Sequence, residues 1–354
     1  MTKVKEDRLP GLVFGHYQSK VLPKAYGIRH SIYEIMKTLV LLLTLLFPIS
    51  VLAADITADS YLLIEKDSLS IIAGKDYHRP LPPASTTKVL TSIIALEKLN
   101  EQDSIVPGEK VLSIPASKLN LLPGKSYQAI DLIKGAMIES ANDAAYALSV
   151  AIGGSEDRFS DIMNAKARDI GARDSNFENA SGLYVPNHVS SAYDLALIFR
   201  YALQNQRFQE VVGTKYFLFK RGSEDVKYMN HNRLLFCFEP SIGGKTGFTR
   251  ASKHCYVGAF EKEGKTYILS ILGSRSLWRD ACAILENVYK DVPTEQELIL
   301  AKANKVSLAS LRVKKTVHVQ KDKKQRRQKK MMEKAGTKKK VNKGTKGKRK
   351  PRRV

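Results

Sequence analysis

The pattern of hydrophobic and polar positions shows two short apolar runs between residues 60 and 76. The segment "SYLLIEKDSLSIIAGKD" has one run on each side of a Lys-Asp-Ser turn. This arrangement is typical of a β-hairpin, in which turn-forming residues separate two strands. The sequence therefore predicts a hairpin at the start of a domain.

The next part of the chain has the spacing of amphipathic helices, with apolar residues recurring at intervals of three and four. Helices are predicted at 85–99, 129–138, 142–152, 156–170 and 191–204. Gly153-Gly154 and Gly171 are expected to end two of them, because glycine accepts the left-handed backbone found at many helix C-termini.

Strand-like patterns return after about residue 214. They lie in "KYFLFK", "VKYMNHNRLLF" and "HCYVGAFEKEGKTYILSILGS", with Glu263-Gly264 as a tight hairpin turn. The segment "LWRDACAILENVYKDV" predicts a last helix. Strands at both ends of a helical block predict an α+β fold, an antiparallel sheet with helices packed on it.

Residues 1–54 are predicted to be an N-terminal extension plus a signal segment. "MKTLVLLLTLLFPISVLAAD", from Met36 to Asp55, has a basic residue, an apolar run and small residues in the order of a secretory signal. Translation could start at Met36, and the short apolar run leaves an uncleaved anchor open. We expect export to the periplasm or to the outer face of the cytoplasmic membrane, with the mature chain beginning at Ala54 or Asp55.

Residues 293–354 are predicted to be a linker and a basic, disordered tail. From residue 314 onward, 20 Lys and Arg face two acidic residues, a net charge of +18 that leaves +5 for the rest of the chain. Such blocks of like charge do not form a packed core. The tail is a candidate for binding an anionic membrane or wall polymer, or it is only a solvated extension. It lacks aromatic residues for base stacking, so we do not expect nucleic-acid binding.

The cysteine content does not indicate a disulfide framework or a metal site. Cys237, Cys255 and Cys282 are odd in number, and no Cys/His spacing is typical of zinc. One disulfide and three free thiols both stay open. We expect no metal and no cofactor.

Three short motifs carry the candidate chemistry. Ser85 and Lys88 form Ser-x-x-Lys, and Ser140 and Asn142 form Ser-x-Asn. Residues 245–247 read Lys-Thr-Gly and are expected at the start of a strand. Each alone has an ordinary interpretation as a helix cap or a turn. Each occurs once, in the order found in β-lactamases and penicillin-binding proteins, so together they are a strong signal.

The serine and lysine of the first motif are the residue types that a nucleophilic mechanism needs. Ser85 becomes a nucleophile only when a base takes its proton, and Lys88, one helical turn away, is that base if it is neutral. Burial and the neighbouring charge of Lys245 would lower the pKa of Lys88. We expect the backbone N–H groups of Ser85 and Phe248 to bind the oxyanion.

The other motif residues are expected to bind substrate and move protons. Ser140 can pass a proton between Ser85, a lysine and the leaving amine. Asn142 can hold the substrate's peptide group through its amide. Lys245 and Thr246 can bind a terminal carboxylate, and Gly247 is expected to leave room for a ligand against the strand edge.

From about Tyr61 to Tyr289 the chain resembles the low-molecular-mass penicillin-binding proteins of the serine D-alanyl-D-alanine carboxypeptidase family. The segments that carry the resemblance are "MIESANDAAYALS", "MNAKARDIGARDSNFENASGL", "HVSSAYDLALI", "HNRLL" and "GGKTGFT". The resemblance implies a penicillin-binding transpeptidase/β-lactamase-like fold and a catalytic D,D-peptidase domain at 55–292. It implies removal of the terminal D-Ala from peptidoglycan stem pentapeptides, with β-lactams as inhibitors.

The family pattern is not matched at every point. Many relatives have a second, β-rich domain and a C-terminal amphipathic helix. Only about 60 residues follow the catalytic domain here, and we expect them to be too few and too basic for that arrangement. His188 matches a histidine of similar family segments, and we expect it to be structural.

Three other functions stay open. One is a D,D-endopeptidase that cuts crosslinks. Another is a β-lactamase, although the chain has Ser-Ala-Asn where class A enzymes have Ser-Asp-Asn. The third is an inactive wall-binding module.

Overall fold

The computed structural model describes residues 36–37 and 55–301. The expected signal segment, apart from residues 36–37, and the basic tail lie outside the described residues. No helix in the described part of the chain is long and apolar enough to cross a membrane.

Five strands form the central antiparallel sheet, in the order β2-β1-β9-β8-β7. Their bounds are β1 (Ser60–Glu65), β2 (Ile71–Lys75), β7 (Ser241–Thr249), β8 (Lys253–Lys262) and β9 (Lys265–Ser274). Two small ribbons pair β3 (Ser104–Ile105) with β4 (Tyr127–Gln128), and β5 (Tyr216–Arg221) with β6 (Glu224–Met229). The strand β7, which carries the Lys-Thr-Gly motif, is an edge of the sheet.

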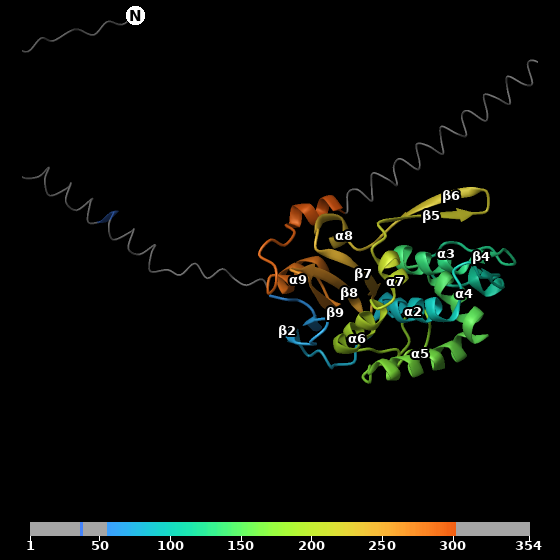
Figure 1. Ribbon diagram of the computed structural model, residues 1–354, viewed down its shortest axis with the longest axis horizontal. Coiled ribbons are helices and arrows are strands. Elements are labelled where there is room, and N and C mark those ends of the chain that lie inside the picture. Colours follow the sequence, from blue (N-terminus) through green and yellow to red (C-terminus); the bar gives the residue numbers. More distant parts are fainter. Residues whose placement is uncertain (1–35, 38–54, 302–354) are drawn as a thin grey trace, which may run out of the picture. The chain divides into compact units, whose positions relative to one another are not determined.

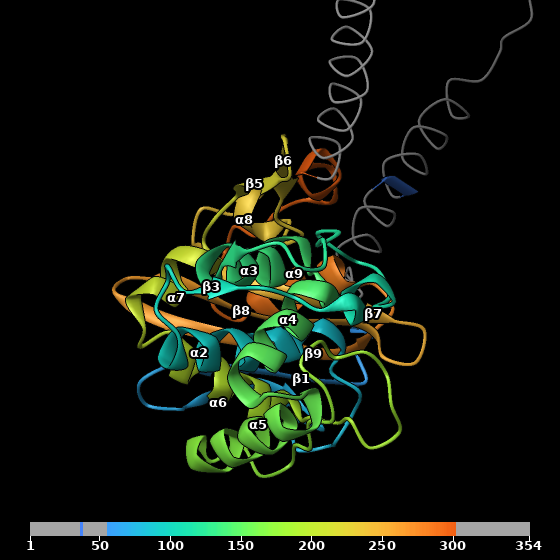
Figure 2. The same cartoon turned by 90° about the vertical axis from the view of Figure 1, so that its right-hand side faces the viewer.

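Helices lie on both faces of this sheet (Figures 1 and 2). They are α2 (Lys88–Lys98), α3 (Ala129–Lys134), α4 (Asn142–Gly153), α5 (Glu156–Ile170), α6 (Ala192–Ala202), α7 (Gln206–Val212), α8 (Leu234–Cys237) and α9 (Leu277–Leu285). Shorter turns are the 3₁₀ segments η1 (Ala84–Thr87) and η2 (Glu109–Leu112) and the π-helical turn η3 (Gly135–Glu139). The fold is α+β, as predicted.

Alternation along the strands builds two separate hydrophobic cores. On β1, Leu62 and Ile64 pack in the core beneath α2–α7, whereas Leu63 packs in the core beneath α9. On β8, Val257 likewise packs in the core beneath α2–α7, and Tyr256 packs in the core beneath α9. Successive side chains of a strand point to opposite faces, so one sheet joins the helical block to α9.

Most of the predicted elements are confirmed. The first hairpin is β1 and β2, and Glu263-Gly264 is the turn between β8 and β9. Gly154 and Gly171 end α4 and α5 in left-handed conformations, with φ of 76° and 93°. The helix α7 was not predicted; it lies between the helix predicted at 191–204 and the strands predicted after about residue 214.

The strand prediction for "VKYMNHNRLLF" is wrong in its second half. Strand β6 stops at Met229, because two asparagines bend the chain through side-chain bonds to the backbone. Asn230 Oδ1 accepts from the N–H of Asn232, and Asn232 Oδ1 accepts from the N–H of Leu234, where α8 begins. Such local bonds compete with strand pairing.

Two further expectations are corrected. The Lys-Thr-Gly motif lies within β7, not at its start, because pairing with β8 already begins at Ser241 and continues past a bulge. The last helix ends at Leu285, earlier than predicted, and the Asn287 amide bonds the carbonyl of Ile284 at this end.

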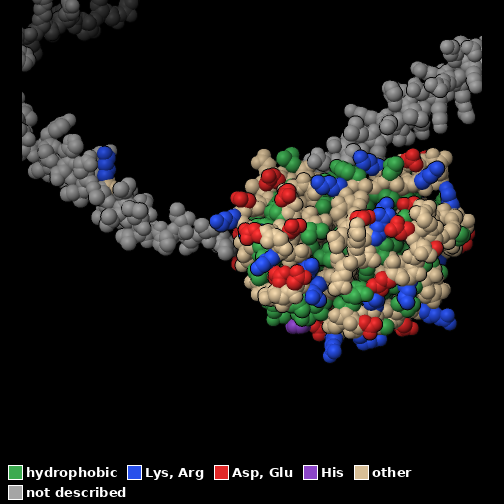
Figure 3. Space-filling view, in the orientation of Figure 1, with side chains coloured by type: hydrophobic (Ala, Val, Ile, Leu, Met, Phe, Trp, Pro, Cys, Tyr) green, Lys and Arg blue, Asp and Glu red, His purple; other side chains and the backbone are tan. Residues whose placement is uncertain are grey.

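The packed part of the chain continues beyond residue 292. Leu298 and Ala301 are buried, and Leu298 belongs to the core beneath α9 together with Phe238 and Leu285. Cys237, Cys255 and Cys282 are free thiols, so none of them forms a disulfide. Figure 3 shows acidic and basic side chains interspersed on one face of the folded part, which matches its small net charge.

Gly182 fixes the position of η1. Its φ is +78°, and a Cβ there would lie 1.8 Å from the Ala84 carbonyl oxygen and 2.8 Å from Thr87 Oγ1. The backbone at residue 182 therefore touches the turn before α2, where the only side chain that fits is a hydrogen atom.

We expect Gly182→Ala to lower the free energy of unfolding by more than the cost of a left-handed alanine, which is on the order of 1–2 kcal/mol. The added methyl group must also displace η1. Gly264→Ala is the matched control, because Gly264 has φ +73° and nothing within 4 Å of an added Cβ. Denaturant unfolding of both variants tests this, and equal losses would contradict it.

Candidate active site

Ser85 and Lys88 lie at the start of α2, as their spacing predicted. Ser85 is in the 3₁₀ turn η1 and caps nothing with its side chain, and Lys88 is the first residue of the helix. Lys88 Nζ lies 2.9 Å from Ser85 Oγ. The side chain of Lys88 is completely buried, whereas Ser85 is half-buried and borders a cleft.

Two acceptors orient the amine of Lys88. Nζ lies 2.7 Å from Asn142 Oδ1 and 2.6 Å from the Ser181 carbonyl oxygen. A neutral amine has two N–H groups and one lone pair. The two acceptors use both N–H groups, so the lone pair is left facing the Ser85 hydroxyl.

Burial lowers the pKa of Lys88 well below its ordinary value of 10.5, and the positive charge of Lys245 lowers it further. The carboxylate of Asp143 acts weakly in the opposite direction. Both causes expected from the sequence are therefore present. They favour the neutral amine, which is the form that can accept a proton.

The second motif lies at the junction between η3 and α4. Ser140 has a left-handed backbone, with φ of 63°, and its hydroxyl accepts from Lys245 Nζ at 3.0 Å. Lys245 Nζ also donates to the Thr246 carbonyl oxygen at 2.8 Å. Only 1% of Lys245 is exposed to solvent. Its ammonium therefore contacts the site through the hydrogen bond to the Ser140 hydroxyl.

Asn142 has its amide fully engaged. Its Oδ1 accepts from Lys88, and its Nδ2 donates to the carbonyls of Pro115 and Ala116, both at 3.0 Å. The amide orients the lysine in this arrangement. Holding a substrate's peptide group, as expected from the sequence, would require it to exchange one of these partners.

The third motif meets the nucleophile directly. A Cβ on Gly247 would lie 2.8 Å from the Ser85 backbone nitrogen and 2.9 Å from Ala84 Cβ. The turn that carries Ser85 fills the space that a Cβ would take, although Gly247 also lines the cleft, so its expected role of leaving room for a ligand stays a prediction. The contact brings the Ser85 N–H to the edge of β7, next to Phe248.

His188 is a buried structural residue. Its Nδ1 accepts from the Glu178 N–H, and its Nε2 lies 2.9 Å from Thr87 Oγ1. Burial lowers the pKa of His188 to about 4, with a further contribution from Lys88. The neutral ring ties the loop around residue 182 to the first turn of α2.

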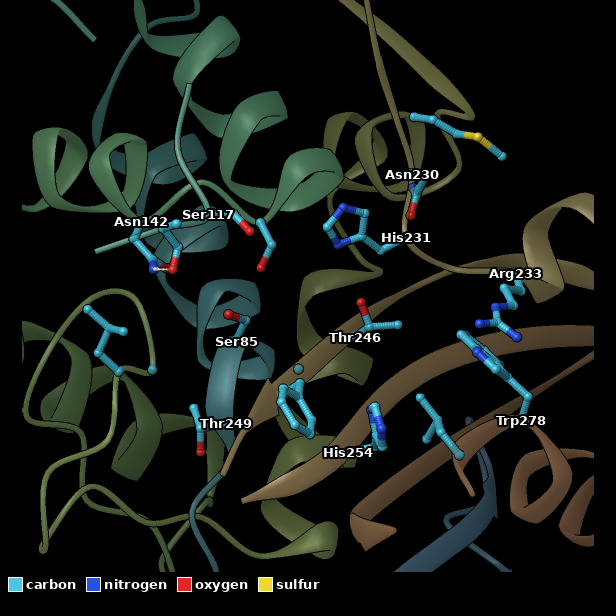
Figure 4. A pocket seen from close by; sticks show the side chains of 18 of the residues that line it. Ser85, Ser117, Asn142, Asn230, His231, Arg233, Thr246, Thr249, His254 and Trp278 are labelled. Atoms are coloured by element: carbon cyan, nitrogen blue, oxygen red, sulfur yellow. Dashed lines mark hydrogen bonds between the residues drawn. The ribbon is translucent and has the colours of Figure 1, made fainter. Parts of the chain in front are cut away.

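A cleft of about 530 Å³ opens beside Ser85. Figure 4 shows Ser117 and Asn142 on one side of Ser85, and Thr246, His254, Arg233 and Trp278 on the other. Sequence reasoning missed the lining residues Ser117, His231, Arg233, His254 and Trp278. His231 and Arg233 belong to the "HNRLL" segment, to which no role was assigned. The others are far apart in the sequence, with Ser117 between η2 and β4, His254 on β8 and Trp278 on α9, and only the fold brings them to one cleft.

Comparison with known proteins agrees with this geometry. A family model described as D-alanyl-D-alanine carboxypeptidase matches residues 48–276. The chain is 31% identical over 245 residues to the D-alanyl-D-alanine carboxypeptidase DacB2 of Mycobacterium tuberculosis, covering 67% of this chain and 84% of that protein. It is 33% identical over 224 residues to DacF of Bacillus subtilis, covering 61% of this chain and only 57% of the relative.

Solved structures show the same fold. A D-alanyl-D-alanine carboxypeptidase from M. tuberculosis superposes with a TM-score of 0.64 and 30% identity, over 68% of this chain and 94% of that one. The Streptomyces K15 DD-transpeptidase superposes with a TM-score of 0.61 and 27% identity, over 66% of this chain and 97% of that one. The chain belongs to the serine-type D-alanyl-D-alanine carboxypeptidase family.

Proposed function

We propose that the protein removes the terminal D-Ala from peptidoglycan stem pentapeptides through an acyl-enzyme on Ser85. Family membership supports the reaction class. The observation that carries the assignment is the contact of 2.9 Å between Ser85 Oγ and the buried amine of Lys88.

In the acylation step, Ser85 Oγ attacks the carbonyl carbon of the penultimate D-Ala. The hydroxyl proton passes to the lone pair of Lys88 Nζ as the new C–O bond forms. We expect the backbone N–H groups of Ser85 and Phe248 to bind the developing oxyanion, and the contact of β7 with the nucleophile's turn at Gly247 supports this expectation.

The tetrahedral intermediate collapses when the bond to the leaving nitrogen breaks. The amine of the leaving D-Ala needs a proton. The Ser140 hydroxyl, which accepts from Lys245 Nζ, relays to this amine the proton that Lys88 took from Ser85, so Lys88 is neutral again. Water then attacks the acyl carbon and gives a proton to Lys88, the bond from this carbon to Ser85 Oγ breaks, and Lys88 returns the proton to Ser85 Oγ as the shortened peptide leaves. β-Lactams would acylate the same serine and stay attached.

A crosslink-cutting endopeptidase is the nearest alternative. The motifs and the cleft suit both reactions, and the K15 relative is named a DD-transpeptidase. Mass spectrometry of products from a defined pentapeptide and from a crosslinked dimer separates these activities.

Location and attachment form the second part of the proposal. The substrate lies outside the cytoplasm, which agrees with the export expected from residues 36–55. N-terminal sequencing of the protein recovered from cells would identify cleavage before Ala54 or Asp55.

The basic tail from residue 314 is proposed to hold the enzyme on an anionic membrane or wall polymer. Both segments lie almost wholly outside the described residues, so these statements stay predictions.

Labelled penicillin should form a stable adduct on the peptide that carries Ser85, and Ser85→Ala should abolish it. Lys88→Ala should slow acylation by about 10²–10⁴-fold, the usual contribution of a general base. Peptide mapping by mass spectrometry locates the label. Thr86→Ala is a neighbouring control. Undiminished labelling of Ser85→Ala would contradict the assignment.

The rate of acylation should rise with pH through the lowered pKa of Lys88 and then level off, because only the neutral amine accepts a proton. Removing the charge of Lys245 with Lys245→Met should move this rise to higher pH, since that charge lowers the pKa of Lys88. Stopped-flow acylation between pH 5 and pH 10 measures both profiles. A rise that stays in place or moves to lower pH would refute this electrostatic role of Lys245.

Deleting residues 314–354 should leave activity on a soluble pentapeptide unchanged and release the enzyme from anionic vesicles. Each basic residue near such a surface contributes about 1 kcal/mol, and salt screens this attraction. Vesicle co-sedimentation at rising salt measures it. Equal binding by the truncated protein would leave the tail as a solvated extension.

A further inference from the structure

Asp143 is a buried carboxylate beside the catalytic residues. It follows Asn142 in the first turn of α4, and its side chain is completely shielded from solvent. Its Oδ1 accepts from the N–H of Leu119 at 3.0 Å and from the N–H of Ala144 at 2.9 Å, and its Oδ2 accepts from the N–H of Leu121 at 3.1 Å. These N–H groups offset the cost of taking the carboxylate out of water.

Residues 115–121 are attached to the start of α4 by two sets of hydrogen bonds. The two N–H groups of Leu119 and Leu121 donate to Asp143. Asn142 donates the other set, which ends at the carbonyl oxygens of Pro115, Ala116 and Ser117. Figure 4 shows Ser117 next to Asn142 at the cleft. Two adjacent residues of α4, one donating and one accepting, therefore hold this segment in place.

The position of the segment decides which way the Asn142 amide points. Nδ2 can only donate, so the carbonyls of Pro115 and Ala116 hold it toward the segment and leave Oδ1 toward Lys88. A reversed amide would place Nδ2 beside Lys88 Nζ, where it would donate to the lone pair of the neutral amine. That lone pair is the base for Ser85, so the orientation of this amide keeps the base available.

We propose that Asp143 is a positioning residue for the acylation of Ser85: it fixes residues 115–121 on α4, and this segment keeps the Asn142 oxygen turned toward Lys88. Asp143 does not line the described cleft, so it acts through Asn142 and not on the substrate. The inference rests on the proposed function, because it concerns the same acylation step. It adds a residue that lies outside the three motifs.

The charge of Asp143 has a second effect on the base. Burial lowers the pKa of Lys88 most, the charge of Lys245 on β7 lowers it further, and the carboxylate of Asp143 on α4 raises it. His188, in the segment before α6, is neutral at neutral pH because its own pKa is about 4. Asp143 therefore stabilises the protonated Lys88 that forms when Ser85 attacks.

The test measures the rate constant for acylation of the full-length protein by a labelled penicillin, with Asp143→Asn compared with wild type. The variant keeps the shape of the side chain, but one oxygen becomes an NH₂ group that faces the N–H of Leu119 or of Leu121. The rate constant should fall by about 10–100-fold, as expected when a reacting group is displaced. An unchanged rate constant would overturn the proposal.

The pH profile of the same reaction gives a readout that a loss of stability does not change. In Asp143→Asn the rise of the rate with pH should move to lower pH, because the charge that raises the pKa of Lys88 is gone. Asp143→Glu keeps the charge and should restore the profile. It should restore only part of the rate, since the longer side chain displaces residues 115–121. A rise that stays in place in Asp143→Asn would contradict the proposal.

Asp280 provides a matched control, because it is also a buried carboxylate in the first turn of a helix. It accepts from the backbone and hydroxyl of Thr57 and from the hydroxyl of Ser274. Asp280→Asn should lower the melting temperature without changing the acylation rate constant or its pH profile. If Asp143→Asn behaves in the same way, with fewer active molecules that each react at the wild-type rate, Asp143 has a structural role only.

A double-mutant cycle with Asn142→Ala tests whether Asp143 acts through the amide. Asp143→Asn should slow acylation much less in the Asn142→Ala background than in wild type, and equal losses in both would overturn the proposal. Asp143→Glu replaces Asp143→Asn in the cycle if the latter does not fold. Failure of both variants to fold, with a folded Asp280→Asn, would also leave Asp143 with a structural role only.

Acylation by penicillin reports on Ser85 without a peptide substrate, so this inference and the proposed function can fail separately. Release of D-Ala from a pentapeptide by the wild type tests the proposed function. Wild-type release of D-Ala together with unchanged acylation of Asp143→Asn would reject only the role of Asp143. The expected changes in Asp143→Asn without any wild-type release of D-Ala would reject only the proposed substrate.

Discussion

The burial of one amine, that of Lys88, is the constraint on which the rest of the structure depends. An ammonium group taken fully out of water costs several kcal/mol unless a counter-charge lies beside it. Here the nearest strong influence is the like charge of Lys245, which adds to the effect of burial. The fold resolves the conflict by favouring the neutral amine and by giving its two N–H groups the acceptors Asn142 Oδ1 and Ser181 O.

This solution requires three parts of the chain to meet at one turn. The acceptors come from the start of α4 and from the loop around residue 182, and the charge comes from β7. Gly182 and Gly247 allow the last two to touch η1 from either side, where a Cβ would overlap the backbone. Ala84 and Ser140 both have left-handed backbones, with φ of 50° and 63°. Such conformations cost on the order of 1–3 kcal/mol and persist where the surrounding contacts fix them.

The features that could be predicted from the sequence are those that depend on the spacing of nearby residues. The α+β class, most helices, the hairpin turn and the meeting of Ser85, Lys88, Ser140 and Lys245 follow from periodicity and from three motifs. The missed features depend on backbone atoms or on distant pairs. No sequence pattern predicts that the Ser181 carbonyl accepts a hydrogen bond from Lys88. The turns at Asn230 and Asn232 were hidden because "VKYMNHNRLLF" is apolar enough to resemble a strand.

The same limit applies to the roles of the charged residues. From the motif alone, Lys245 was assigned both to the pKa of Lys88 and to the substrate's carboxylate. These two roles oppose each other, because a bound carboxylate would neutralise the charge that keeps Lys88 unprotonated. The pKa of Lys88 would then rise at the moment when the base is needed.

The burial of Lys245 reduces that conflict. Its ammonium lies behind Ser140, donates to the Ser140 hydroxyl and is almost completely shielded from the cleft. The charge that lowers the pKa of Lys88 is therefore separated from a bound substrate by a hydroxyl group. This separation lets the base stay neutral with the substrate in place, and it gives a physical reason why the lysine of the third motif is buried instead of exposed to the cleft.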